Sequence, residues 1–172
     1  MSRKAIVSVI FSSLFVVLFS VPSFALKVGD VAPSVENLKH KMMSGELVPD
    51  TLLSVNQNGQ YLVMEFFATT CSACSENLPL LAEIKNQFKN QVSFKLVAID
   101  RDEPTVLNYI QQVALAQEFT TVLDSKRLAL KTYEVKYTPT TFVVSPEGKI
   151  VFKHIGVFEP ETMQELRDIL TK

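Results

Sequence analysis

The amino-acid sequence predicts a mixed α/β sheet with helices on both faces. Apolar runs of strand length alternate with segments whose apolar residues recur every three or four positions, in the order βαβαβαββα. The 172 residues are 47% apolar, which is enough to build the core of one domain. With 17 basic and 18 acidic side chains, the composition gives no support for nucleic-acid binding, which requires a basic surface.

The predicted domain begins with residues 27–49, which are mixed and polar and are expected to form an extended lead-in with room for one short strand or helix. Asn58-Gly59 signals a tight turn, so 51–57 is expected to pair with the strand that follows. That strand, 60–68, is apolar on both pleat faces, which is typical of a central strand covered on both sides.

The rest of the chain continues the alternation. A helical apolar pattern runs over 71–90, and Pro79 within it predicts a kink. The later elements are expected in this order: a strand at 92–99, a helix from Pro104 with an apolar stripe that reaches Ala114, a strand at 121–123, a short helix at 126–133, strands at 140–144 and 149–155, and a last helix from Pro160.

Residues 1–25 have the features of a secretory signal peptide. The start carries two positive charges, 5–21 carries none, and Ser-Phe-Ala at 23–25 is a small-x-small cleavage pattern. Cleavage is therefore expected after Ala25, which leaves a domain over 26–172. The alternative is an uncleaved anchor, although the uncharged segment spans only about 26 Å against a hydrocarbon core about 30 Å thick. In either case the domain is expected in the periplasm or another extracytoplasmic space, where disulfides persist.

Cys71 and Cys74 are the only cysteines of the chain, and they directly follow the strand at 60–68. In the chain-entropy model a disulfide between them contributes only about 2 kcal/mol, against about 4.7 kcal/mol for a loop of 100 residues. The pair is therefore poorly placed to stabilise the fold and well placed as a reversible redox switch. A structural disulfide and half of a metal site are the alternatives.

A cysteine that opens a helix has specific chemistry. Free N–H groups and partial positive charge there stabilise a thiolate, so the pKa of Cys71 should be depressed. Because the thiolate is the attacking species in disulfide exchange, Cys71 is the candidate nucleophile. Cys74 lies one turn further on the same face and is the candidate resolving thiol, which attacks Cys71 and releases the product.

Glu65 and Pro139 are two further candidates. Glu65 lies in a strand that is apolar on both faces, so burial should raise its pKa and let it exchange a proton with Cys74. The alternative is that Glu65 reaches the sheet edge or pairs with a lysine. Pro139 directly precedes an apolar strand, and its peptide bond is either cis in a tight turn or trans at the first residue of the strand.

These motifs resemble the thioredoxin superfamily and, within it, the extracytoplasmic TlpA/ResA-like thiol–disulfide oxidoreductases. The resemblance covers most of the mature chain and rests on Val-Met-Glu-Phe-Phe-Ala-Thr-Thr-Cys-Ser-Ala-Cys at 63–74, Pro79, Thr-Pro-Thr-Thr-Phe at 138–142 and a last hairpin at 148–156. It implies a thioredoxin-like fold, in which a central mixed sheet carries an extra βα insertion.

The resemblance also implies roles for individual residues. Cys71 takes the family's nucleophile position, Cys74 the resolving position and Pro139 the position of a cis-proline that faces the cysteines. The backbone of Thr138 would then pair with an extended substrate segment. Glu65 falls where thioredoxin itself has a buried aspartate.

Four residues depart from the family pattern. Thr70 stands where a Trp usually precedes the first cysteine, and Ser72-Ala73 is neither the Gly-Pro of thioredoxins nor the Pro-His of a strong oxidant. Asn77 stands where many members carry a glutamate, so the role of that glutamate is not carried over. Without the Trp, the resemblance leaves the substrate preference open.

The sequence therefore predicts an exported thiol–disulfide oxidoreductase that needs no cofactor or metal and acts on other exported proteins. The resemblance favours disulfide reduction, as in cytochrome c maturation, with a membrane-bound electron donor because the periplasm is kept oxidising. The alternatives are a net thiol oxidant, a peroxiredoxin-like peroxidase and a copper chaperone that uses Cys71, Cys74 and His154. Contact with the membrane is expected only if 5–21 is an uncleaved anchor.

Overall fold

The computed structural model describes residues 26–42, 46–54, 59–89 and 91–172. The predicted signal peptide, residues 55–57 of the strand expected at 51–57 and the turn residue Asn58 lie outside the described residues. The elements run in the order β1 (Leu38–Lys41), β2 (Leu47–Asp50), β3 (Tyr61–Phe67), α1 (Ser72–Gln87), β4 (Val92–Ala98), α2 (Glu103–Gln112), the 3-10 helix η2 (Ala114–Glu118), β5 (Thr120–Leu123), α3 (Leu128–Thr132), β6 (Thr140–Val144), β7 (Ile150–Ile155) and α4 (Pro160–Leu170).

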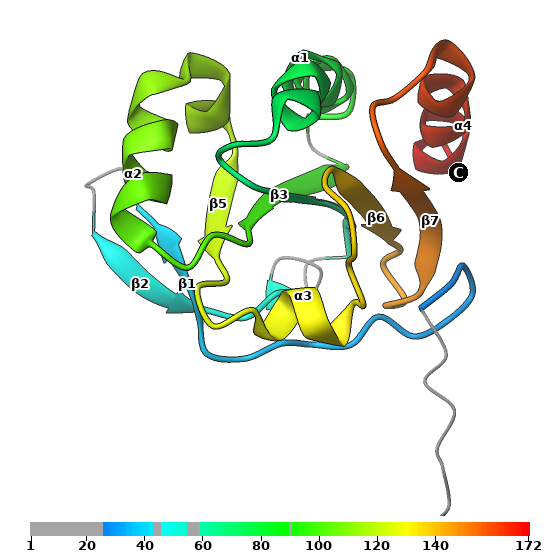
Figure 1. The fold of residues 1–172 in the computed structure, drawn as a ribbon. Helices are drawn as coiled ribbons and strands as arrows, with labels where there is room; N and C mark the ends of the chain where they lie inside the picture. Colours follow the sequence, from blue (N-terminus) through cyan, green and yellow to red (C-terminus); the bar gives the residue numbers. More distant parts are fainter. Residues whose placement is uncertain (1–25, 43–45, 55–58, 90) are drawn as a thin grey trace, which may run out of the picture.

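A seven-stranded sheet forms the centre of the described part, with the strand order β2-β1-β5-β4-β3-β6-β7 (Figure 1). The three middle strands β5, β4 and β3 run parallel to one another. The strands on either side, β1 with β2 and β6 with β7, join the sheet antiparallel. The sheet is therefore mixed, as the sequence predicts.

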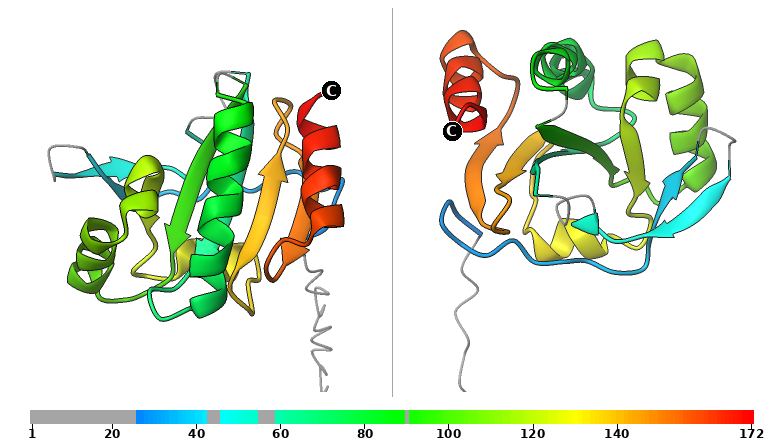
Figure 2. Two further views of the ribbon diagram at one scale, coloured as in Figure 1. Left: turned by 90° about the horizontal axis from the view of Figure 1, so that it is seen from above. Right: turned by 180° about the vertical axis from the view of Figure 1, so that it is seen from behind.

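Helices cover both faces of the sheet. α1, α2 and α4 lie on one face, and α3 lies on the other with the N-terminal lead-in (Figure 1 and Figure 2). Successive side chains of β3 point to opposite faces of the sheet, so this strand contributes to the cores on both sides. Val63 and Phe67 pack into the core beneath α1 and α4. Leu62 and Phe66 pack into a second core with Tyr133. The predicted α/β class, with helices on both faces, is confirmed.

The lead-in differs from the prediction. The sequence predicts a strand at 51–57 paired with β3. The described part of this segment, 51–54, forms no strand, and the structure places β2 at Leu47–Asp50, paired with β1. The reason is that β4 and β6 occupy the two edges of β3, so neither edge is available to the lead-in. β1 joins the sheet at β5 instead, through Lys39 and His40.

A buried lysine anchors this lead-in. Lys95 is 1% exposed in β4, and its Nζ donates to Asp50 Oδ2 at 2.8 Å, to the Thr51 carbonyl at 2.8 Å and to Ser54 Oγ at 2.9 Å. Burial acts to raise the pKa of Asp50, but hydrogen bonds from Lys95 and Ser54 outweigh it and hold that pKa below its ordinary value. Burial lowers the pKa of Lys95, and Asp50 offsets part of this effect. The pair ties the lead-in to the middle of the sheet.

The helices follow the sequence signals with small differences. α1 continues through Pro79 as one helix. The side chain of Asp102 caps α2 by accepting from the N–H of Thr105. α2 ends at Gln112, so Ala114, expected in its apolar stripe, begins η2 instead. Among the described residues, no helix is both long enough and apolar enough to cross a bilayer.

Candidate active site

The two cysteines lie at the start of α1, after the turn that follows β3. They form a disulfide, and Cys71 is the N-cap residue of the helix. The backbone N–H of Cys74 donates to the Sγ of Cys71 at 3.2 Å, so the sulfur takes the place of a capping oxygen. Cys71 is partly exposed, whereas Cys74 is only 1% exposed. A substrate can therefore reach Cys71 and not Cys74.

The surroundings of Cys71 favour a negative charge on its sulfur. The first turn of α1 contains no acidic side chain, so the partial positive charge of the helix start is not offset there.

The preceding loop is fixed by Thr69, whose N–H donates to Asp100 Oδ2 at 3.1 Å and whose hydroxyl donates to Oδ1 at 2.8 Å. Because Asp100 lies two residues after the end of β4, this contact ties the cysteine loop to the end of the neighbouring strand.

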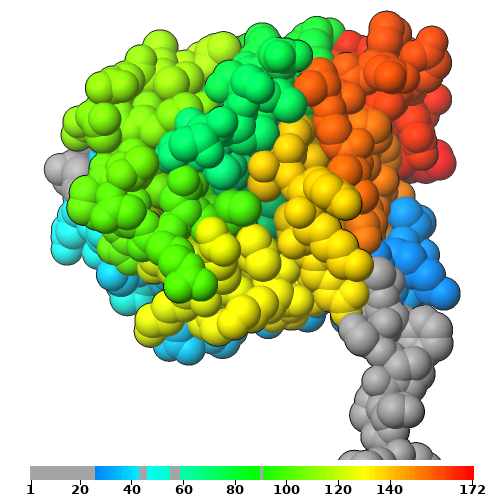
Figure 3. Space-filling view, viewed as in Figure 1, coloured from blue at the N-terminus to red at the C-terminus, as the bar shows by residue number. Residues whose placement is uncertain are grey.

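The loop before β6 faces the cysteines. The Thr138–Pro139 peptide bond is cis. The carbonyl oxygen of Thr138 lies 3.4 Å from the Sγ of Cys71, and the N–H of Gly156 donates to the Pro139 carbonyl at 2.9 Å. On the face shown in Figure 3, the start of α1 (green), the loop before β6 (gold) and the loop after β7 (orange) meet. The structure therefore brings Cys71 next to the backbone of the predicted substrate-binding residues.

Glu65 lies beneath these cysteines in the middle of β3. Its neighbours on the same pleat face, Val63 and Phe67, belong to the core cluster that contains Cys74, so the Glu65 side chain lies on the α1 side of the sheet. It is 1% exposed. The alternative in which it reaches solvent at the sheet edge is therefore not what the structure shows.

The two carboxyl oxygens of Glu65 differ in their hydrogen-bond partners. Oε2 accepts from the side-chain amide of Asn77 and from the hydroxyl of Thr141, the latter at 3.3 Å. Oε1 is buried and has no hydrogen-bond partner among the described residues. Desolvation outweighs the two hydrogen bonds and raises the pKa of Glu65 to about 7. A carboxyl with this pKa can both give and take a proton near neutral pH.

The side chain of Asn77, for which the sequence predicts no role, contacts Glu65 directly. It is 0% exposed. Its Nδ2 donates to Glu65 Oε2, and its Oδ1 accepts from the N–H of Phe158 at 2.9 Å. Its spacing in the sequence could have indicated this position. Asn77 comes three residues after Cys74, which places the two residues about one helical turn apart on the same face of α1.

The side chain of His154 contacts residues of β7 and of the loop that follows it. The Nε2 of His154 lies 3.2 Å from the Val157 carbonyl oxygen, and the ring stacks on Phe152. In the ranges that the structure describes, no group of three or more His, Cys, Asp or Glu side chains is arranged to hold a metal ion.

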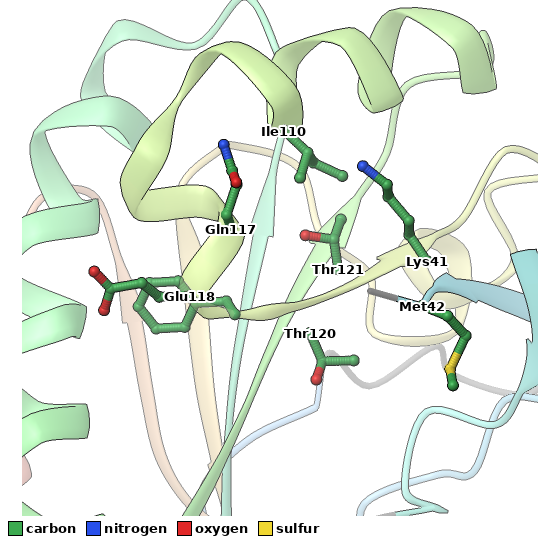
Figure 4. A pocket seen from close by; sticks show the side chains of 8 residues that line it. Lys41, Met42, Ile110, Gln117, Glu118, Thr120 and Thr121 are labelled. Atoms are coloured by element: carbon green, nitrogen blue, oxygen red, sulfur yellow. The ribbon is translucent and has the colours of Figure 1, made fainter. Parts of the chain in front are cut away.

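A pocket of about 380 Å³ lies between the end of β1, η2 and the start of β5 (Figure 4), and none of the predicted site residues lines it.

Comparison with known proteins agrees with this geometry. The family model described as Redoxin matches residues 27–170. The chain belongs to the Redoxin family. The thiol-disulfide oxidoreductase ResA of Bacillus subtilis strain 168 is 32% identical over 112 residues, which cover 65% of this chain and 62% of that protein. ResA of Bacillus anthracis is 26% identical over 145 residues, which cover 78% of this chain and 80% of that protein.

Solved structures of related proteins share the fold of this redoxin. A candidate thiol:disulfide interchange protein DsbE from Chlorobium tepidum is 26% identical, with a TM-score of 0.69, and covers 85% of this chain and 97% of its own. The thioredoxin domain of a thiol-disulfide oxidoreductase from Bacteroides vulgatus is 25% identical, with a TM-score of 0.67, and covers 84% and 99%. The redoxin is thus a TlpA/ResA-like member of the thioredoxin superfamily, in the class of thiol–disulfide oxidoreductases.

Proposed function

We propose that this redoxin is exported and reduces disulfide bonds in other exported proteins. The observation that carries the proposal is the unequal setting of its two cysteines. Cys71 is accessible at a helix start, and Cys74 is buried on the same side of the sheet as a carboxyl whose pKa is about 7. The signal-like composition of residues 1–25 supports export.

The reaction takes two exchange steps. The Cys71 thiolate attacks a substrate disulfide, forms a mixed disulfide and releases the first substrate sulfur as a thiolate. Cys74 then gives its proton to Glu65 and attacks the Sγ of Cys71, so that the second substrate sulfur leaves as a thiolate. The substrate gains two electrons and, after protonation by solvent, two thiols. The protein gives up the two electrons and is left with the Cys71–Cys74 disulfide.

The backbone next to Cys71 supports recognition of an extended substrate segment. With the Thr138 carbonyl 3.4 Å from the Cys71 sulfur, a chain carrying the target cysteine would run along the loop before β6 and pair with the backbone of Thr138. Apocytochrome c is one substrate of this kind. A membrane-bound dithiol donor would return the protein to its reduced form, since an oxidising compartment does not.

Trapping tests this proposal. In Cys74→Ser the first step proceeds and the second cannot, so mixed disulfides between Cys71 and exported proteins should accumulate and disappear on treatment with a thiol reductant. Cys71→Ser is the matched control, because it retains a cysteine but lacks the accessible nucleophile. If Cys74→Ser captures no more exported protein than this control, the proposed activity is wrong.

A further inference from the structure

The hydrogen bonds of Asn77 are directional. The backbone N–H of Phe158 can only donate, so the atom of Asn77 that meets it must be the carbonyl oxygen Oδ1. The amide nitrogen is therefore turned toward Glu65, where it donates to Oε2. Rotation of the amide by half a turn would set two donors against each other at Phe158. Because Asn77 and Glu65 are both buried, solvent does not replace either partner.

This fixed amide makes the two oxygens of Glu65 different. Oε2 accepts from both Asn77 and Thr141, whereas Oε1 has no partner within the described ranges. Protonation of Oε2 would displace one of its two donors. The proton of the neutral acid is therefore favoured on Oε1.

We propose that Asn77 is a positioning residue for the resolving step, in which it holds Oε2 as an acceptor so that Oε1 exchanges the proton with Cys74. The inference rests on the proposed function, because it concerns the second exchange step. Cys74 lies one turn before Asn77, and both are buried on the face of α1 that packs on β3. The S–H bond of Cys74 breaks, an O–H bond forms at Oε1, and the freed electron pair bonds to Cys71 as the bond from Cys71 to the substrate breaks.

Few groups near Glu65 can titrate. Its neighbour on β4 is the apolar Leu96. On the same side of the sheet lie Cys74 and Asn77 from α1, Thr141 from β6 and, one strand further in the same row, His154 from β7. The other polar or ionisable side chains that pack against this core are those of Tyr61, Cys71 and Tyr109. In the part of the chain that the structure describes, no charged side chain pairs with Glu65. Desolvation raises the pKa of Glu65, and the hydrogen bonds from Asn77 and Thr141 set how far that rise is offset.

The test follows the two steps separately with Ellman's reagent, which needs no physiological substrate. Release of the first thionitrobenzoate reports the attack by Cys71, and release of the second reports resolution by Cys74. Asn77→Ala removes the donor to Oε2. The apparent pKa of the second step should rise by about one pH unit, and at a pH below it the second step should slow by up to about tenfold. The rate of the first step should be unchanged.

Three further variants separate positioning from a structural role. Asn77→Leu has nearly the same volume and fills the space that Asn77→Ala leaves, so it covers the case in which Asn77→Ala does not fold. It also lacks the donor and should shift the profile in the same direction. Asn86→Asp, on the exposed side of the same helix, should leave both steps unchanged. In a Glu65→Gln background, Asn77→Ala should have no further effect on the second step.

The carboxyl carbon of Glu65, followed by carbon-13 NMR in the oxidised protein, should report the same rise in pKa in Asn77→Ala. The inference is overturned if the folded Asn77 variants keep the wild-type pH profile, or if they lose as much in the Glu65→Gln background. Failure of the proposed function looks different: wild-type protein would resolve the reagent normally while Cys74→Ser captured no exported protein.

Discussion

Glu65→Gln should remove most of the pH dependence that this carboxyl gives to the stability of the oxidised protein. Glu65 is 1% exposed, and desolvation raises its pKa from 4.5 to about 7. Because the pKa in the folded state is above the unfolded value, its stabilising effect is fully present below 4.5 and is lost as the pH rises through about 7. Gln does not ionise, so the variant lacks this loss.

The size of the effect follows from the two pKa values. At about 1.4 kcal/mol per pKa unit, the difference between 4.5 and about 7 corresponds to about 3 kcal/mol of free energy of unfolding. Relative to the variant, the wild-type protein should therefore lose about 3 kcal/mol between about pH 4 and about pH 9. In acid, where the carboxyl is neutral in both states, the two proteins should differ by less than about 1 kcal/mol.

Urea unfolding of the domain from Leu26 measures this directly. The disulfide is kept intact so that neither cysteine titrates in the folded protein. Glu165→Gln, on the exposed side of α4, is the matched control and should follow the wild-type curve. If the wild-type and Glu65→Gln curves stay parallel from acid to alkaline pH, the folded protein does not resist ionisation of Glu65, and the proton-exchange role loses its physical basis.

Two other substitutions test the contact that anchors the lead-in and the contact that fixes the cysteine loop. Lys95→Met removes the buried cation that pairs with Asp50 and should lower the free energy of unfolding by about 3 kcal/mol in urea, while Asp50→Asn in the same protein should recover part of the loss. An unchanged midpoint would contradict this anchoring role. Thr69→Val removes the hydroxyl bond to Asp100 and should cost about 1 kcal/mol, whereas Thr70→Val, at an exposed neighbour, should cost little; equal effects would show that the contact does not fix the loop.

The parts of the site that lie within one stretch of chain could be predicted from the sequence. An apolar run, a short loop and a helical pattern place Cys71 at a helix start, because strand and helix periodicities are local properties. The same apolar run predicts that the Glu65 side chain is buried, and the structure has it so. The order of the elements likewise predicts the mixed sheet.

The parts that depend on tertiary packing could not be predicted in this way. Asn77 is polar in a helix pattern, and only the packing of α1 and of the loop at Phe158 against β3 shows that both ends of its amide are used. The placement of β1 and β2 depends on which sheet edges remain open after β3 has paired. In the sequence, Lys95 is a charged residue within an apolar strand, and only the fold shows that Asp50 lies beside it as an ion-pair partner. Each of these contacts joins residues that are far apart in the chain, so local sequence patterns do not predict it.

The reduction potential of the Cys71–Cys74 couple, measured in glutathione buffers on the domain from Leu26, tests the central claim most directly. A protein that reduces other exported proteins should have a value near or below about −250 mV, in the range of thioredoxin. A value near about −120 mV, like that of DsbA, would make the protein an oxidant and contradict the proposed direction.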